Sequence, residues 1–365
     1  MSELRLKLRT QGEDGFSLAI DCQIPATGVT AIYGPSGSGK TTLLQCIAGL
    51  QRAPGDNLVR FMGDHWQNDT QFTPPWQRHL GFVFQDARLF PHLNVRENLA
   101  YAEKRNPRDK KIAFDDVVHW LQLASLLPRL PESLSAGQTQ RVAIGRALLS
   151  NPRLLLMDEP LANLDHAARQ ECLFYLQRLR ASLDLPFLYV SHDIEEVSQI
   201  ADYLLLLENG RIEAQGSMLE LCSRLDTRLS HEEQAAAIVV GTLQAQDTQF
   251  GLSEIQIAGQ TLYINHIEAA PGQQRRLRIP ARDVSICKTR PLDSSILNIV
   301  AVEVHEIEKT NGSRLLLRLA LGDQYLLARI TRKSASMLAL KRGDQVFAQI
   351  KSAAMLNEPL TRYSI

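Results

Sequence analysis

The sequence lacks any long apolar run. A membrane-spanning helix needs roughly 20 consecutive apolar residues, and no stretch of this 365-residue chain approaches that length. The N-terminal segment MSELRLKLRTQ also lacks the apolar core of a secretory signal peptide. We therefore expect the chain to stay in the cytosol, so that any role at a membrane depends on a partner protein.

Charge of one sign is not in excess either. The chain has 40 Lys and Arg against 40 Asp and Glu, whereas a protein dedicated to nucleic acids normally carries a basic face. The sequence thus argues against nucleic acid as a partner.

The cysteines are scattered, with no Cys-x-x-Cys pair or His-Cys cluster to hold zinc. The sequence therefore predicts reduced, mostly buried thiols at Cys22, Cys46, Cys172, Cys222 and Cys287.

The chain is longer than one ordinary domain, so two domains are expected. Its first part alternates apolar runs with amphipathic stretches, a pattern typical of a mainly parallel sheet covered by helices on both faces. Strands are predicted at 29–33, 81–84, 154–157, 187–190 and 203–207, and helices at 111–124, 138–149 and 166–183. This first domain is predicted to be of the α/β class and to span 1–230.

The pattern changes near residue 230. Helical signals nearly vanish, and short runs typical of antiparallel strands take over. These runs lie at 236–242, 277–279, 299–304, 314–319 and 345–350. A second, all-β domain is therefore predicted for 231–365, with a small OB-like barrel as its expected form.

A glycine-rich segment follows the first of the predicted apolar strands. Residues 34–41 read GPSGSGKT, which matches G-x-x-x-x-G-K-[ST] between a strand and a helix. Glycines let backbone N–H groups curve around phosphates, and the helix N-terminus adds a favourable dipole. An ordinary glycine-rich turn is the alternative, but all eight positions and both flanks fit a phosphate loop. The predicted nucleotide contacts are Gly34, Pro35, Ser36, Gly37, Ser38, Gly39, Lys40, Thr41 and Thr42.

Two carboxylates, Asp158 and Glu159, end a later apolar strand. With a phosphate loop upstream, Asp158 is predicted to hold Mg²⁺ together with Thr41, and Lys40 to reach the β and γ phosphates of ATP. Glu159 is then placed as the general base that polarises the attacking water. An acidic pair that only caps the following helix is the alternative.

The segment LSAGQ, residues 134–138, precedes a predicted helix. It resembles the signature sequence of ABC ATPases, usually LSGGQ, with Ala136 in place of the first glycine. The resemblance covers about residues 3–230 and implies a P-loop NTPase fold with a helical subdomain at about 88–150. It also implies that Ser135 and Gly137 contact the γ-phosphate held by an opposite subunit. Capping of its own helix is a further role open to Ser135, and the two roles can coexist.

The other elements of an ABC ATPase follow in the expected order. Gln85 resembles the Q-loop glutamine, which bridges magnesium and the surface that meets the membrane subunit. Asp165 is similar to the D-loop residue that crosses between subunits. His192 resembles the switch histidine at the γ-phosphate; a lone histidine at a strand end is more often structural, but its order and spacing favour the switch role.

The residue that stacks on adenine is the least defined element. Family members usually carry an aromatic residue well before the phosphate loop, and this chain offers only Phe16 there. Phe16 could equally be a core residue at the start of a strand, so both interpretations stay open.

Two parts of the chain indicate the type of transporter. Residues 84–92 (FQDARLFPH) and 95–99 (VRENL) closely resemble the ATPases of molybdate importers, whereas sulfate and ferric-ion relatives diverge around 86–88. The tail at about 291–358 resembles the small molybdate-binding-protein barrel of these ATPases, and 278–284 resembles a segment of importer ATPases with an accessory barrel. The resemblance therefore favours molybdate as the transported ion.

The tail is also a candidate regulatory site for molybdate. Oxyanion-binding members gather the dianion with serine hydroxyls, a lysine and an arginine, but Leu297 stands where arginine is usual. We hypothesise a weakened or purely structural anion site, and ordinary barrel surface is the alternative. The residues assigned to it are Ser295, Asn298, Lys351 and Ser352.

The resemblance also implies an assembly. Two copies of the chain would close head to tail on two Mg-ATP, on the cytoplasmic face of the inner membrane. Partners would be hydrophobic permease subunits and, through them, a substrate-binding protein. A sulfate, thiosulfate or ferric-ion importer is the alternative. An ABC ATPase acting on nucleic acid or ribosomes is disfavoured, because no coiled-coil heptads separate Gly39 from Leu134 and the chain holds one cassette.

Overall fold

The computed structural model describes residues 3–11, 15–55, 57–105, 112–308, 312–351 and the backbone of 354–359. The chain forms two compact units, Met1–Gly216 and Ser217–Ile365. No helix in the described residues is long and apolar enough to cross a membrane. The sequence placed the end of the first domain at residue 230, and this position stays a prediction.

Ten described strands of the first unit form one sheet, in the order β5-β4-β1-β2-β10-β9-β3-β8-β7-β6. Five neighbouring strands at one end run parallel to one another. They are β9 (Tyr203–Glu208), β3 (Val29–Tyr33), β8 (Phe187–Ser191), β7 (Leu154–Asp158) and β6 (Leu80–Val83). These are the five apolar runs that the sequence predicted as strands, because a strand covered on both faces carries few polar residues.

The rest of the sheet adds antiparallel strand pairs to the mainly parallel arrangement that the sequence predicted. β1 pairs in antiparallel fashion with β2 and β4, and β4 pairs likewise with β5. Leu4, Leu6 and Leu8 of β1 are buried, while the residues between them are partly exposed. Such alternation, rather than a continuous apolar run, is typical of antiparallel strands with one wetter face. The bounds are β1 Glu3–Gln11, β2 Ser17–Pro25, β4 Leu58–Phe61, β5 Asp64–Gln67 and β10 Arg211–Ser217.

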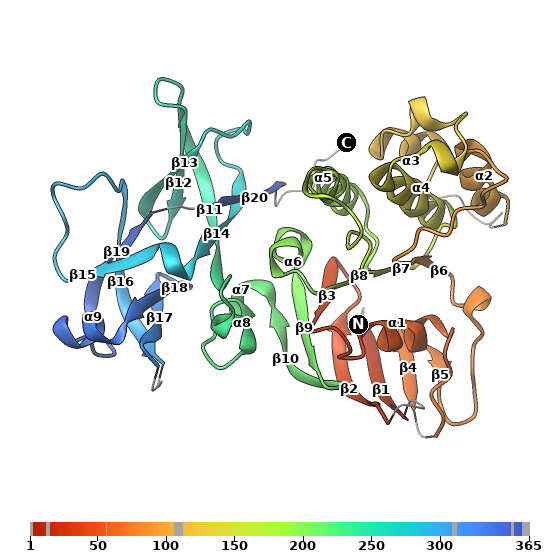
Figure 1. Ribbon diagram of the computed structural model, residues 1–365, viewed down its shortest axis with the longest axis horizontal. Coiled ribbons are helices and arrows are strands. Elements are labelled where there is room, and N and C mark those ends of the chain that lie inside the picture. Colours follow the sequence, from red (N-terminus) through yellow and green to blue (C-terminus); the bar gives the residue numbers. More distant parts are fainter. Residues whose placement is uncertain are drawn as a thin grey trace. The chain divides into compact units, whose positions relative to one another are not determined.

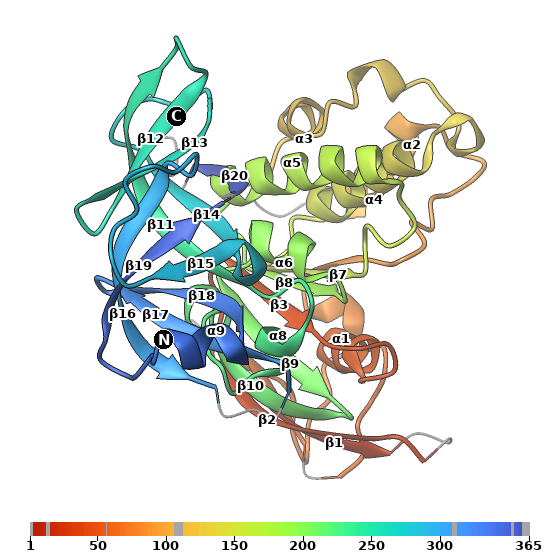
Figure 2. The ribbon, with the colours of Figure 1, turned by 60° about the vertical axis from the view of Figure 1, so that its left-hand side comes forward.

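Helices cover both faces of the parallel strands, as predicted. Leu155 and Met157 of β7 belong to the core shared with α4 and α5, whereas Leu154 and Leu156 belong to the core shared with α1. Figures 1 and 2 both show α1 and α5 on opposite sides of β3, β7 and β8. The bounds of these helices are α1 Lys40–Ala48, α4 Ala136–Leu149 and α5 His166–Ser182.

Helices α2 (Val95–Arg105), α3 (Phe114–Trp120) and α4 contact one another at one end of the first unit, at the upper right of Figure 1. They lie within the stretch assigned to a helical subdomain. The helix predicted at 111–124 corresponds to α3, although residue 111 itself lies outside the described residues. α3 is shorter than predicted because Gln122 adopts a left-handed backbone, with φ of 49°.

The second unit is rich in β-structure, which confirms the predicted all-β domain. Its described strands form two five-stranded sheets, β13-β12-β11-β14-β20 and β15-β19-β16-β17-β18. Four strands of the first sheet, β11 to β14, precede the barrel region that was predicted at about 291–358. The domain therefore contains a second sheet in addition to that region. The strands of the first sheet are β11 Ala236–Asp247, β12 Leu252–Ile257, β13 Gln260–Asn265, β14 Gln274–Pro280 and β20 Ala354–Pro359. The second comprises β15 Val284–Cys287, β16 Asn298–Ile307, β17 Arg314–Leu321, β18 Gln324–Thr331 and β19 Gln345–Ile350.

Three side-chain amides join these two sheets, each by one accepted and one donated hydrogen bond to a single backbone residue. The pairs, with distances of 2.6 to 2.9 Å, are Asn298 with Tyr263, Gln260 with Ala301, and Gln324 with Val240. Each amide makes the two bonds that a neighbouring strand would make.

This arrangement corrects the assignment of Asn298 as an anion ligand. Asn298 is buried, and both its amide oxygen and its amide nitrogen are bonded to Tyr263. Of the other residues assigned to that site, Ser295 and Lys351 are exposed, and Ser352 lies outside the described residues. Asn298 therefore serves the packing of the two sheets.

Candidate active site

The phosphate loop lies between β3 and α1, and its last glycine starts the helix. Gly39 is the N-terminal cap of α1 with φ of 98°, a conformation that favours glycine. A Cβ on Gly39 would lie 2.6 Å from the ring of Phe16. Both backbone and space therefore require glycine here, and the loop can present its N–H groups to an anion at the helix N-terminus.

The ammonium group of Lys40 is a buried cation within this loop. Its side chain is 4% exposed, and Nζ donates hydrogen bonds to the carbonyl oxygens of Gly34 at 2.8 Å and Pro35 at 2.9 Å. Nζ also lies 3.6 Å from Oε1 of Glu159. Phosphate oxygens form stronger, charge-assisted bonds than carbonyl oxygens, so this amine is placed to turn toward a bound phosphate.

Thr41 and Asp158 form an all-oxygen pair beside the loop. Thr41 Oγ1 donates to Asp158 Oδ1 at 3.0 Å. Burial raises the pKa of Asp158, and the Thr41 bond opposes this shift by favouring the carboxylate. A hydroxyl and a carboxylate suit Mg²⁺, which is usually bound by one or two carboxylates plus substrate phosphates.

Gln85, the third residue predicted to bind Mg²⁺, is exposed after β6. Its side chain forms no hydrogen bond within the described residues, so its role at the metal stays a prediction.

Glu159 lies directly after β7, between the loop lysine and the predicted switch histidine. Its carboxylate is 3.6 Å from Lys40 Nζ and 3.0 Å from His192 Nδ1. The side chain is 18% exposed, so water can reach it. Glu159 also has φ of 43°, a left-handed conformation that costs of order 1 kcal/mol or more and is concentrated at functional sites. The structure thus brings Lys40, Glu159 and His192 together, as the sequence predicted.

The signature and D-loop residues form a second group. Ser135 caps α4 in a capping box with Gln138, which confirms the capping role left open above. Asp165 caps α5 by accepting from Ala168 N at 2.9 Å. A Cβ on Gly137 would lie 3.1 Å from Ala168 Cβ, so a side chain there would require α4 or α5 to shift by a few tenths of an ångström.

The helices that follow the signature and the phosphate loop pack on different faces of the sheet. α4 and α5 share the core on one face, and α1 packs in the core on the other. Ser135 and Asp165 are exposed. Their contact with the nucleotide of a second copy stays a prediction.

Sequence reasoning missed two charged residues near Glu159. Arg169 and Glu196 line a small pocket together with Glu159, Ser191 and His192. Neither belongs to a motif, and a glutamate in a short helix carries no signal in the sequence that it is buried. Their proximity to Glu159 follows only from the packing of α5 and α6 (Ile194–Ile200) against the strand ends.

Comparisons with family models and solved structures identify the two kinds of domain in the chain. The model described as ABC transporter matches residues 18–162, and the model described as TOBE domain matches 294–356. cbiO1 from Clostridium perfringens, part of the ABC transporter complex cbiONQ, has a TM-score of 0.53 and 26% identity over 61% of this chain and 91% of its own. An ATP-binding cassette of an ABC transporter in its ADP conformation has a TM-score of 0.51 and 27% identity over 60% and 92%.

Curated relatives match nearly the whole chain. The molybdenum import ATP-binding protein ModC of Hahella chejuensis is 46% identical over 94% of this chain and 96% of its own. ModC of Pseudomonas aeruginosa is 45% identical over 98% of this chain and 100% of its own. The resemblance identified from the signature and the tail is thereby confirmed. The chain belongs to the family of the molybdenum import ATP-binding proteins of ABC transporters.

Proposed function

We propose that the chain hydrolyses ATP to drive molybdate import, as one of two identical ATPase subunits of an ABC transporter. The observation that carries the proposal is the convergence of Lys40 and His192 on the Glu159 carboxylate. A buried cation, a carboxylate and a histidine around one point are suited to phosphate binding and to activation of water. The names of the relatives support molybdate as the ion.

In this proposal each residue has one task. Lys40 exchanges its two carbonyl partners for phosphate oxygens, and Glu159 accepts the proton of the attacking water. His192 orients the Glu159 carboxylate and faces the γ-phosphate. Thr41 and Asp158, with Gln85, would hold Mg²⁺, which when bound would neutralise charge on the phosphates. The partner copy would supply Ser135, Gly137 and Asp165 to the same nucleotide.

Phe16 is proposed to stack on the adenine. Its ring lies against Gly39 at the phosphate loop and is partly buried at the edge of the core, so it can serve both roles left open by the sequence. We expect Phe16→Ala to raise the Kd for ATP about 5- to 10-fold, since aromatic stacking contributes about 1 kcal/mol, with little change in kcat. Titration with a fluorescent ATP analogue measures this. Phe174→Ala, at a half-exposed aromatic on α5, is the control. An unchanged Kd would leave Phe16 as a core residue.

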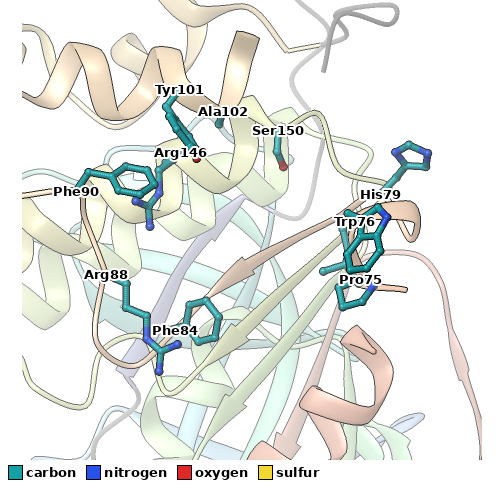
Figure 3. Close-up of a pocket in the computed structure, with 11 residues that line it drawn as sticks. Pro75, Trp76, His79, Phe84, Arg88, Phe90, Tyr101, Ala102, Arg146 and Ser150 are labelled. Carbon is teal, nitrogen blue, oxygen red and sulfur yellow. The ribbon is translucent and has the colours of Figure 1, made fainter. Parts of the chain in front are cut away.

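The permease is proposed to dock beside the Q-loop, in a pocket of about 490 Å³ (Figure 3). Trp76 is 78% exposed there, and the Arg88 guanidinium lies 4.0 Å from the centre of the Phe84 ring. Exposed aromatic residues with arginine are enriched at protein interfaces. Arg146 of α4 lines the pocket and donates to Ala87 O at 3.1 Å. This bond links the helix that begins at the signature to the Q-loop.

Docking on the permease would place the chain at the cytoplasmic face of the inner membrane, with the substrate-binding protein on the other side. Cells without this chain are expected to lose molybdate uptake at low external concentration, measured as cellular molybdenum, while sulfate and iron uptake are unchanged. The wild-type chain should restore uptake, and a Glu159→Gln chain should not. Normal molybdate uptake with a loss of sulfate or iron uptake would contradict molybdate as the ion.

A further inference from the structure

The carboxyl group of Glu196 lines the same small pocket as that of Glu159, the proposed general base. Glu196, in the first turn of α6, is 5% exposed. Its Oε2 accepts a hydrogen bond from Ser191 Oγ at 3.2 Å, and Ser191 Oγ in turn accepts from Asp193 N at 3.0 Å. These bonds span the three-residue segment 191–193, whose middle residue is His192. Glu196 is therefore connected to both ends of the segment that carries the switch histidine.

Glu196 and Glu159 line the same small pocket, with Arg169 as the cation at its wall. The other oxygen of Glu196, Oε1, is buried and has no hydrogen-bond partner among the described residues. Arg169 donates hydrogen bonds to Asp193 Oδ2 at 3.4 Å and to Leu164 O at 3.2 Å. A buried carboxylate needs compensation for its charge, and Arg169 donates to other acceptors.

The charges around Glu196 favour its neutral form. Burial is the main cause that raises the pKa of Glu196 to about 8, the negative charge of Glu159 raises it further, and Arg169 opposes the shift. Asp193, Glu195 and His192 are the remaining titratable groups of the same segment and helix. Arg169 is the facing charge on α5. At pH 7 the group is thus mainly a carboxylic acid.

We propose that Glu196 is a positioning residue for ATP hydrolysis, which as a neutral acid holds the segment 191–193 so that His192 stays against Glu159. The inference rests on the proposed ATPase function. A neutral acid keeps the Ser191 hydroxyl in place without adding a second negative charge beside Glu159. Ionisation of Glu196 would set two carboxylates against each other across the shared pocket, which raises the energy of the arrangement that keeps His192 at 3.0 Å from Glu159.

The folded-state pKa of Glu196 lies above its unfolded value, so the folded chain binds more protons, and stability falls as pH rises from about 4.5 to about 8. Wild-type kcat should also decline as pH rises through about 8. Glu196→Gln cannot ionise and keeps the neutral shape. It should therefore retain kcat within about twofold at pH 7 and lose this decline.

The test uses the full-length chain with its permease, and records kcat, the Kd for ATP and Tm from pH 6 to 9.5. Glu196→Ala should lower kcat about tenfold at pH 7 through the lost hydrogen bond, with an unchanged Kd. Glu195→Gln, an exposed neighbour on the same helix, is the matched control and should keep the wild-type profile. The Tm of Glu196→Gln should exceed that of the wild type by more at pH 8 than at pH 5.

Outcomes of this test separate the two proposals. A wild-type complex that hydrolyses no ATP would contradict the proposed function. An active wild type with an alkaline decline that persists in Glu196→Gln would overturn only the role of Glu196. If Glu196→Ala does not fold, Ser191→Ala decides, because it removes the same hydrogen bond and should lower kcat with an unchanged Kd; wild-type kcat in Ser191→Ala would then overturn the inference.

Discussion

Replacing Glu159 with glutamine is expected to lower the rate of ATP hydrolysis by about 100-fold or more while ATP still binds. A positioned general base contributes roughly 10²- to 10⁴-fold to a rate, and glutamine keeps the shape of the side chain but cannot accept the proton. The amide can still contact His192, which lies 3.0 Å from the carboxylate. Phosphate release at saturating Mg-ATP and calorimetric titration of ATP measure the two effects separately.

The same variant should trap the dimer. If nucleotide is bound but not cleaved, two copies are expected to stay closed on ATP, which size-exclusion chromatography with Mg-ATP detects. Glu132→Gln, an exposed glutamate just before the signature, is the control and should hydrolyse ATP as the wild type does. A wild-type rate in Glu159→Gln would remove Glu159 from the role of base.

Replacing Lys40 with methionine should abolish tight nucleotide binding. Methionine keeps most of the buried stem, so the variant tests the charge rather than the packing. Removal of one partner of a buried, hydrogen-bonded charge pair costs about 2–5 kcal/mol, which corresponds to roughly 30- to 5000-fold in Kd. Hydrolysis should become undetectable, because the phosphates lose the cation that Gly34 and Pro35 hold at 2.8 and 2.9 Å.

A matched control separates this effect from a general loss of positive charge. Lys104→Met changes an exposed lysine on α2 of the same unit and should leave the Kd for ATP unchanged. Thermal unfolding without nucleotide should show that Lys40→Met is folded. ATP binding by Lys40→Met with an affinity close to that of the wild type would contradict the role of the loop lysine.

The parallel part of the sheet could be predicted because burial on both faces leaves a continuous apolar run, as in β7 and β8. The antiparallel strands could not be found by the same criterion. In β1 the signal is the alternation of Leu4, Leu6 and Leu8 with partly exposed residues, which a search for continuous apolar runs does not detect. The number of sheets in the second unit depends on long-range pairing, such as that of β20 with β14, which no local pattern specifies.

The motif residues of the active site were predictable because their spacing is tied to strand ends and helix starts. Lys40, Glu159 and His192 come from three different βα junctions, and the parallel order of β3, β7 and β8 brings those junctions to one edge. Glu196 and Asn298 show the limit of this reasoning. Their roles depend on which atoms surround a buried polar group, and the sequence does not reveal those neighbours.

The bonded amides of the second unit make its two sheets interdependent. Removal of the segment 294–356 would take Asn298 away from Tyr263, Gln324 away from Val240, and the first half of β20 away from β14. The sheet left behind would present an open strand edge and unbonded peptide groups, which promote aggregation. The tail therefore cannot be excised or grafted onto another ATPase at the limits of the TOBE match, and a chimera that folds must carry both sheets together.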